Sequence, residues 1–518
     1  MFDTLIEHGR VLTGDNVTPV LADIGIVGGR IVAVDLLGSA DAVRRIDAGG
    51  QLVLPGFIDS HVHGDLWLLD NDAAPALAQG VTTFVLGQDG TSTAPVTVAT
   101  QDFFRRYFRP VNGDPAVSHD WYSVGEYLQR IDAAAAVNVA YLVPNGNVRA
   151  QVMGLTDRSP STADLQMMAD LVRRGLDEGA VGLSTGLDYI PSRHAGTEEL
   201  IALSKPLAER GGVYVSHMRH SLGRPDLWVA EVEQIAASAG IAGHISHFAG
   251  DSKVNLQLLQ RAHNRGVDLS FDHYPYLAGS TLVAMTVLPP WVQSGGLEVT
   301  RGRLADPAVR RKLFEDWDRS GEPPFNRMPL CYVDSGDYEW AIGLTLDQAA
   351  ETAGTAVRDF VCDLLVETSL GAGSLVWADH AEEDLSELLR SPHHLGCSDG
   401  IYYGQRPHPR GWGAFARFLA RHVRELSDWT LADAVQHLAS GPAARFGLAD
   451  RGRLARGFAA DVVVLDPATV ADSSTYADPK CLAAGVSFVL VNGTVAIDGG
   501  RPTGARAGMA LRRRPSPP

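Results

Sequence analysis

Strand-like and helix-like segments alternate through most of the 518 residues of this chain. Short apolar runs rich in β-branched residues predict buried strands, and apolar residues spaced three and four apart predict amphipathic helices. Helices are expected at 163–178, 197–210, 227–239 and 254–264. Strands are expected at Leu52–Asp59, Thr82–Leu86, Val137–Val143, Ala180–Ser184, Val213–Ser216, Ala242–Ser246, Val267–Asp272 and Leu395–Ser398. Eight such alternations predict an α/β fold, the (β/α)8 TIM-type barrel.

Both ends of the chain carry a different, purely β pattern. Short strand-like runs occupy 1–56, and two more follow at 460–466 and 488–497, the second with the hairpin-forming pair Asn492-Gly493. We therefore expect a small β-sandwich built from both termini, 1–56 and 447–518, beside a central barrel domain, 57–446. A segment at about 281–345, rich in proline, glycine and aromatics, is expected to be an insertion, either a lid or an oligomer contact. Residues 512–518 are expected to form a disordered tail.

Histidines and one acid stand at the carboxyl ends of the predicted strands. His61 and His63 lie two residues apart, so on a strand they share a face. His217 and His247 end the fifth and sixth runs, and Asp399 follows the eighth. The carboxyl ends of barrel strands share one mouth, so these five side chains are expected to meet there. One such histidine alone would indicate a structural role, but the set suits Zn²⁺, with other divalent transition metals as alternatives.

Composition narrows the class of partner. A net charge of −17 disfavours nucleic acid and anionic membranes, so a small-molecule substrate is expected. The 4 cysteines show no C-x-x-C spacing, which fits the reducing cytoplasm. The sequence shows neither a signal-peptide pattern nor an apolar stretch long enough to span a membrane. The sequence does not decide between a monomer and a homo-oligomer.

Several motifs resemble those of one enzyme family. PGFIDSHVH (55–63) is specific for the amidohydrolase superfamily, and GLSTGL (182–187) and HPRGWG (408–413) for its N-acyl-D-amino-acid deacylase (D-aminoacylase) branch. Further matching segments are GVTTFVLGQDG (80–90), GGVYVSHMR (211–219), DHYPYLAGST (272–281), GCSDG (396–400) and GPAARFGLADRGRLARGFAADVVVLDP (441–467). The resemblance covers essentially the whole chain. It implies a zinc-dependent barrel enzyme that hydrolyses an amide bond.

The resemblance also implies how the metal is held. Most relatives bridge two metals with a carboxylated lysine on the fourth strand, but none of the lysines of this chain falls there. The D-aminoacylase branch instead uses a cysteine within Gly-Asn-Cys-Gly after the second strand. Here the matching positions read Gly87-Gln88-Asp89-Gly90, so Asp89 is expected to bridge with a carboxylate. The alternative is that Asp89 only caps a turn. One or two zinc ions are expected.

By the same resemblance, Asp399 takes a proton from the attacking water and passes it to the leaving nitrogen. The implied substrate contacts are Tyr189, Tyr274, Ser280, Arg149 and Arg410. Structural roles are the alternative for the tyrosines, whose buried hydroxyls need partners. The lysine that holds the substrate carboxylate in the branch is replaced by Ala249, although Lys253 is close enough in sequence to reach.

Three hypotheses follow, of which the first is preferred. The chain is a zinc-dependent hydrolase of N-acyl-D-amino acids or similar N-acyl compounds. Alternatively, the same site acts on another amide, a cyclic imide or a carbamate. The third is a non-catalytic scaffold that kept the barrel, which is disfavoured because the five strand-end residues are all present.

Overall fold

The computed structural model describes residues 1–220, 223–378 and 380–513. Its centre is an eight-stranded sheet in the order β17-β13-β12-β11-β10-β9-β8-β6, with neighbours parallel. The strands are β6 (Phe57–Asp59), β8 (Val81–Leu86), β9 (Asn138–Pro144), β10 (Gly182–Gly186), β11 (Val213–His217), β12 (Gly243–Ile245), β13 (Leu269–His273) and β17 (His394–Gly396). The sheet nearly closes where the Ser60 amide donates to the Gly396 carbonyl at 3.3 Å. The predicted barrel is confirmed.

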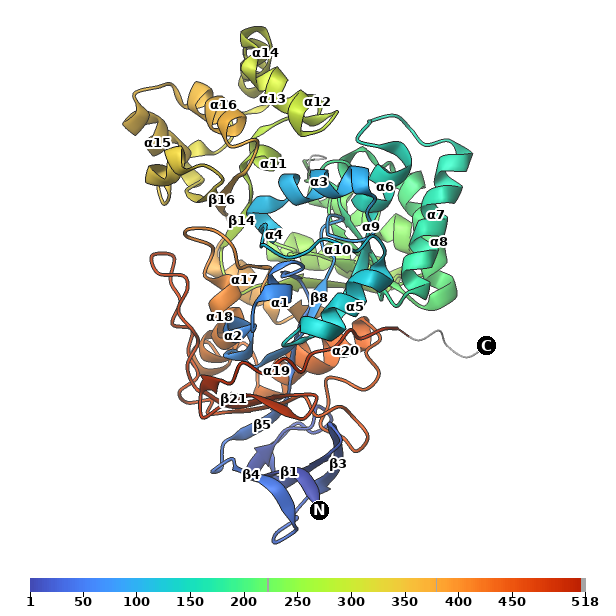
Figure 1. Cartoon of the computed structure of the whole chain (residues 1–518), viewed down its shortest axis with the longest axis vertical. Helices are drawn as coiled ribbons and strands as arrows, with labels where there is room; N and C mark the ends of the chain where they lie inside the picture. Colours follow the sequence, from blue (N-terminus) through green and yellow to red (C-terminus); the bar gives the residue numbers. More distant parts are fainter. Residues whose placement is uncertain (221–222, 379, 514–518) are drawn as a thin grey trace.

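Helices pack around the barrel and fill the connections between its strands (Figure 1). The four expected from sequence are α7 (Thr162–Asp177), α8 (Thr197–Arg210), α9 (Pro225–Ala239) and α10 (Ser252–Asn264). A capping box between Ser161 and Asp164 starts α7, and Gly211, at φ 68°, ends α8. The others are α1 (Trp67–Asp70), α2 (Ala74–Leu77), α3 (Val98–Tyr107), α4 (Arg109–Asn112), α5 (Val124–Ala134), α6 (Asn145–Met153), α17 (Glu382–Leu389), α18 (Arg410–Arg417), α19 (Leu431–Val435) and α20 (Gly441–Arg445).

The first expected strand, Leu52–Asp59, is divided between two sheets. Its first half is β5 (Leu52–Pro55), which pairs with strands of the terminal domain, and its second half is β6 of the barrel. Gly56 separates them, and its amide donates to the Asp461 carbonyl at 2.8 Å. A Cβ at this position would collide with the Thr82 side chain, so the close approach requires glycine.

The two termini together build a nine-stranded mixed sheet. Its strands are β1 (Phe2–Val11), β2 (Val20–Val27), β3 (Arg30–Asp35), β4 (Ala42–Asp47), β5, β19 (Val462–Leu465), β20 (Val486–Val491), β21 (Thr494–Asp498) and β22 (Arg501–Pro502). β19 from the C-terminal part joins β5 from the N-terminal part. The sheet encloses its own cluster of buried side chains, with Ile24, Val53, Val462 and Leu490 at its centre. This confirms the small β domain built from both ends.

A third unit connects β13 to the last barrel strand. Its three-stranded antiparallel sheet contains β14 (Ala278–Leu282), β15 (Leu330–Val333) and β16 (Ala372–Trp377). Its helices are α11 (Val283–Val287), α12 (Pro290–Gln293), α13 (Leu297–Ala305), α14 (Pro307–Ser320), α15 (Leu346–Ala353) and α16 (Val357–Glu367). The unit has a hydrophobic cluster that also contains Phe108, Tyr189 and Ile401 of the barrel domain. It lies opposite the terminal domain along the long axis (Figure 1). The insertion expected at about 281–345 falls within this longer segment.

The last described residues run along the barrel. The Val139 amide donates to the Met509 carbonyl at 2.9 Å, and the Arg513 amide donates to the Gly179 carbonyl at 3.1 Å. Of the tail expected at 512–518, residues 514–518 lie outside the described part of the chain. No helix in the described ranges has the length and apolar character needed to cross a membrane.

Candidate metal centre and active site

Six polar side chains meet at the mouth formed by the carboxyl ends of the barrel strands. They are His61 after β6, His63 at the end of β7 (Val62–His63), Asp89 after β8, His217 at the end of β11, His247 after β12 and Asp399 after β17. β7 pairs in parallel with β18 (Gly400–Ile401), and the Asp399 amide donates to the His61 carbonyl at 2.8 Å. These contacts hold the first and last strand ends together at the mouth.

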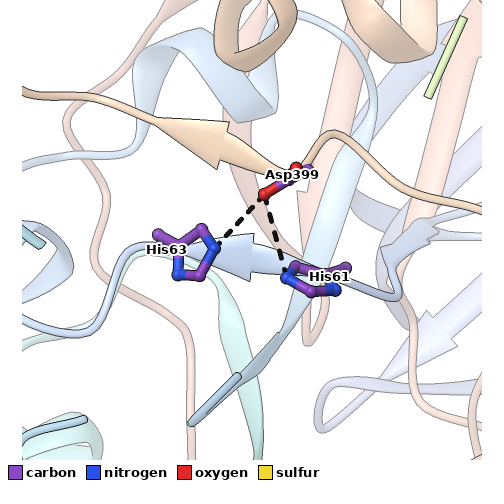
Figure 2. Close-up of side chains that lie close together, drawn as sticks. All are labelled: His61, His63 and Asp399. Atoms are coloured by element: carbon purple, nitrogen blue, oxygen red, sulfur yellow. Dashed lines mark ion pairs between the residues drawn. The ribbon is translucent and has the colours of Figure 1, made fainter. Parts of the chain in front are cut away.

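His61, His63 and Asp399 form one cluster of possible metal ligands. Asp399 Oδ1 lies 3.2 Å from His63 Nε2 and 3.8 Å from His61 Nε2. In Figure 2 both imidazole rings approach the same carboxylate from the segment that follows β6. All three side chains are buried. The arrangement offers two nitrogens and one oxygen to a single cation.

Asp89 connects this cluster to the histidines of the other strands. Its Oδ1 lies 3.5 Å from His61 Nε2 and 3.8 Å from His247 Nε2. Its Oδ2 lies 3.6 Å from His63 Nε2 and 3.8 Å from His217 Nδ1. One carboxylate therefore faces four imidazoles.

The backbone is strained at three of the six positions. Asp89, His247 and Asp399 have φ angles of 55°, 36° and 46°, in the left-handed region that residues other than glycine seldom adopt. Such strain persists only where surrounding structure imposes it, and it collects at functional sites. It directs these side chains into the mouth.

Unpaired buried atoms of two of these residues fit a bound metal ion. His61 Nε2 and Asp89 Oδ1 are buried without a hydrogen-bond partner, a costly state unless a cation binds them. Burial raises the pKa of Asp89, but His61, His217 and His247 together outweigh burial and hold that pKa well below its ordinary value. Burial lowers the pKa of His61, but Asp89 and Asp272 raise it to about 10. A set of imidazoles and carboxylates suits zinc.

A cavity of about 520 Å³ opens onto the metal-ligand cluster. Its floor contains His63, Asp89, His217, His247 and Asp399. The segment between β13 and β17 supplies much of the opposite wall, namely Gly279, Ser280, Thr281, Met285, Thr286, Val376 and Ala378. The volume suits a small organic molecule with one polar end at the metal ligands.

Comparison with known proteins identifies the family. Residues 44–269 and 335–497 match the model of the amidohydrolase family. The chain belongs to the amidohydrolase family. It is 35% identical to the D-aminoacylase of Alcaligenes xylosoxydans xylosoxydans over 99% of this chain and 98% of that protein. It is 34% identical to the N-acyl-D-glutamate deacylase of the same organism, over 99% and 96%. The expected resemblance to the D-aminoacylase branch is confirmed.

Solved structures of D-amino-acid deacylases are also similar to this amidohydrolase over its whole length. A D-aminoacylase crystal structure has a TM-score of 0.82 and 34% identity, covering 99% of this chain and 100% of that one. The N-acyl-D-glutamate deacylase of Bordetella bronchiseptica, in complex with zinc and a phosphonate inhibitor, has a TM-score of 0.82 and 31% identity, with 99% of each chain covered. A D-hydantoinase, at 17% identity and a TM-score of 0.58, shares the fold alone.

Three of the five expected substrate-contact residues, Tyr189, Tyr274 and Ser280, line the cavity of this amidohydrolase. The Tyr189 hydroxyl lies 2.9 Å from Thr281 Oγ1. Arg410 lies behind the wall, where its Nη1 is 2.9 Å from Asp399 Oδ2 and its guanidinium covers the Tyr274 ring. Arg410 is therefore placed to position Asp399, and it does not line the substrate cavity itself.

Arg149 does not reach the cavity. It extends from α6 into a buried ion pair with Glu199 and donates from Nη2 to the Arg158 carbonyl at 2.8 Å. Because Glu199 and the carbonyl already engage its guanidinium, its position does not support the substrate contact expected for it. Ala249 lines the cavity where the branch has a lysine, and Lys253 is exposed on α10.

Two acids near the site were missed by reasoning from sequence. Asp188, after β10, has its Oδ2 3.4 Å from His217 Nε2 and 2.9 Å from His220 Nδ1. Asp272, in β13, accepts from the His247 amide at 2.7 Å and lies 3.5 Å from His61 Nδ1. A carboxylate on the far nitrogen fixes the orientation of a metal-ligating imidazole. Both acids stand at the carboxyl ends of strands, and that position was the available signal.

Proposed function

We propose that this amidohydrolase uses zinc to hydrolyse the amide bond of N-acyl-D-amino acids or closely similar N-acyl compounds. The observation that carries the proposal is the convergence on Asp89 of four imidazoles at the floor of the cavity. The relatives named D-aminoacylase and N-acyl-D-glutamate deacylase support the substrate class.

We propose six residues as zinc ligands for one or two ions: His61, His63, Asp89, His217, His247 and Asp399. Zinc bound there supplies Lewis acidity, which makes water a nucleophile near neutral pH and polarises a carbonyl group. Burial raises the pKa of Asp399, but Arg410 and the neighbouring histidines together outweigh burial and hold that pKa below its ordinary value. Asp399 is therefore ionised and ready to accept a proton from the attacking water. It then returns that proton to the leaving nitrogen.

The test compares N-acetyl-D- and N-acetyl-L-amino acids with zinc-loaded and chelator-treated protein. We expect zinc-dependent release of acetate from the D series, together with one or two zinc ions per chain by elemental analysis. Hydrolysis of cyclic imides or carbamates but not of open-chain acyl amino acids would favour the alternative substrate class. Absence of hydrolysis of either enantiomer with zinc bound would contradict the proposal.

We also propose a reducing, cytoplasmic setting. Its support is that the four cysteines, Cys331, Cys362, Cys397 and Cys481, are all free thiols, three of them buried.

A further inference from the structure

Arg193 lines the cavity but is not one of the six proposed metal ligands. It lies in the short 3-10 helix η1 (Ser192–His194), which follows β10. Among the described residues that line the cavity, it is the one arginine or lysine, and it lies there with Asp188, Asp89 and Asp399. Its Nε is buried and has no hydrogen-bond partner in the described chain. A cation at the substrate cavity is thus left with unused donors.

Two other arginines near the cavity each have a carboxylate partner. Arg219, the neighbour of Arg193, lies 3.2 Å from Glu231 through its Nε. Arg410 is held by Asp399 at 2.9 Å. Leaving the donors of a guanidinium unsatisfied costs free energy, and burial lowers the pKa of Arg193 for the same reason. An anion entering the cavity therefore gains most by binding to Arg193.

The backbone holds Arg193 firmly beside the metal-ligand cluster. The Arg193 amide donates to the Tyr189 carbonyl at 2.7 Å, and its own carbonyl accepts from Arg219 Nη1 at 2.8 Å. Tyr189 in turn packs against the His217 ring at 4.9 Å between centroids. These contacts connect the Arg193 backbone to the site floor by a short segment, so the origin of its side chain beside the cavity is fixed.

We propose that Arg193 binds the α-carboxylate of the substrate. This inference rests on the proposed function, in which the substrate is an N-acyl-D-amino acid. The planar guanidinium matches a carboxylate through two parallel hydrogen bonds. Arg193 reaches the cavity from the loop after β10, whereas the position after β12 presents only the methyl group of Ala249. Lys253 is exposed on α10 and does not line the cavity.

Steady-state kinetics of R193Q with N-acetyl-D-leucine tests the proposal. A charge-assisted pair supplies binding that is equal in the ground state and the transition state, so we expect KM to rise about 10- to 100-fold with little change in kcat. The α-carboxamide of the same substrate distinguishes binding of the carboxylate from a general loss. Wild-type protein should prefer the acid over the carboxamide, and R193Q should lose that preference.

K253Q serves as the matched control, because it removes the alternative cation from an exposed helix position; its KM should equal that of wild type. R193K keeps the charge without the planar fork and should fall between wild type and R193Q. It also provides the readout if R193Q does not fold, as judged by circular dichroism and zinc content. A wild-type KM and an unchanged acid preference in the arginine variants would overturn the inference.

Calorimetric titration of chelator-treated protein with N-acetyl-D-leucine separates this inference from the proposed function. Tighter binding by wild type than by R193Q supports Arg193 as the carboxylate site, whether or not hydrolysis occurs. Equal affinity, or no binding by either protein, overturns it. Absence of hydrolysis by wild-type zinc protein contradicts the proposed function alone.

Discussion

Asp89 is the carboxylate that faces all four histidines of the site. Its carboxylate oxygens lie between 3.5 and 3.8 Å from the nitrogens of four histidines, two from the segment after β6, one from β11 and one after β12. A carboxylate carries a full negative charge on two oxygens, whereas a thiolate presents one sulfur atom. The two oxygens allow two neighbouring cations to be bound by separate atoms of one side chain.

The variant D89N tests this role. It keeps the shape of the side chain but removes its charge, so we expect zinc affinity to fall by more than the roughly 10- to 100-fold caused by losing an outer-shell partner. Zinc remaining after dialysis against a graded chelator measures the change. D89C is the control, since a thiolate also binds zinc and should retain the metal. Equal zinc retention in D89N and wild type would contradict the bridging role.

For single residues, a position at the carboxyl end of a predicted barrel strand was enough to predict which metal-ligand candidates come together. It did not predict all of their neighbours. His61, His63, His217, His247 and Asp399 meet because parallel barrel strands end at one mouth. Asp188 and Asp272 satisfy the same rule but look like ordinary acids in sequence. Reasoning from sequence expected Arg149 at the substrate and did not single out Arg193, because the direction of an arginine from a short helix depends on tertiary packing.

The junction between β5 and β6 connects two domains within a single apolar run. Gly56 turns the chain from the terminal sheet into the barrel, and its amide is held by the Asp461 carbonyl at 2.8 Å. His61 and His63 follow within seven residues of that turn. The register of the first barrel strand is therefore fixed from the terminal domain.

G56A should destabilise the protein. Its Cβ would overlap the Thr82 side chain and force the two strands apart, at a cost of about 1–3 kcal/mol or more. Scanning calorimetry measures the fall in Tm. The matched control is G302A on α13, where a Cβ meets nothing within 4 Å and helix propensity favours alanine by up to about 1 kcal/mol. Equal Tm values for G56A and wild type would contradict the packing argument.

Element boundaries were predictable where local chemistry defines them. The helix expected at 197–210 matches α8, because Gly211 ends it in a left-handed conformation. The run Leu52–Asp59 was not divided in advance, because both halves are equally apolar and the partner Asp461 is some 400 residues away in the chain. A continuous apolar run carries no local mark of a change of sheet.

At the scale of the molecule, the chain forms three units: the barrel, the terminal sheet and the segment between β13 and β17. Buried side chains pack within these units and also across their boundaries. Sequence patterns predicted the first two through strand periodicity. The third mixes short strands with six helices, and its strands β14 and β16 are separated by about 90 residues. Pairing across such a distance leaves no periodic signal, so only part of the unit was expected.

Metal removal should lower the stability of the whole protein. A ligand that binds only the folded state stabilises it by about 4 kcal/mol at a concentration 1,000 times its dissociation constant. Chelator treatment should therefore lower Tm by a few degrees, and added zinc should restore it. Differential scanning fluorimetry provides the measurement, with D89N expected to show a smaller shift. An unchanged Tm after verified zinc loss would contradict the linkage.

The wall of the cavity and its floor come from different parts of the fold. The floor residues are fixed by barrel strands, whereas Ser280, Met285 and Val376 are carried by the segment between β13 and β17. Mutations that reshape that segment can accumulate without disturbing the hydrolytic machinery beneath it. Selection can then diversify substrate preference among descendants while their common chemistry is inherited intact.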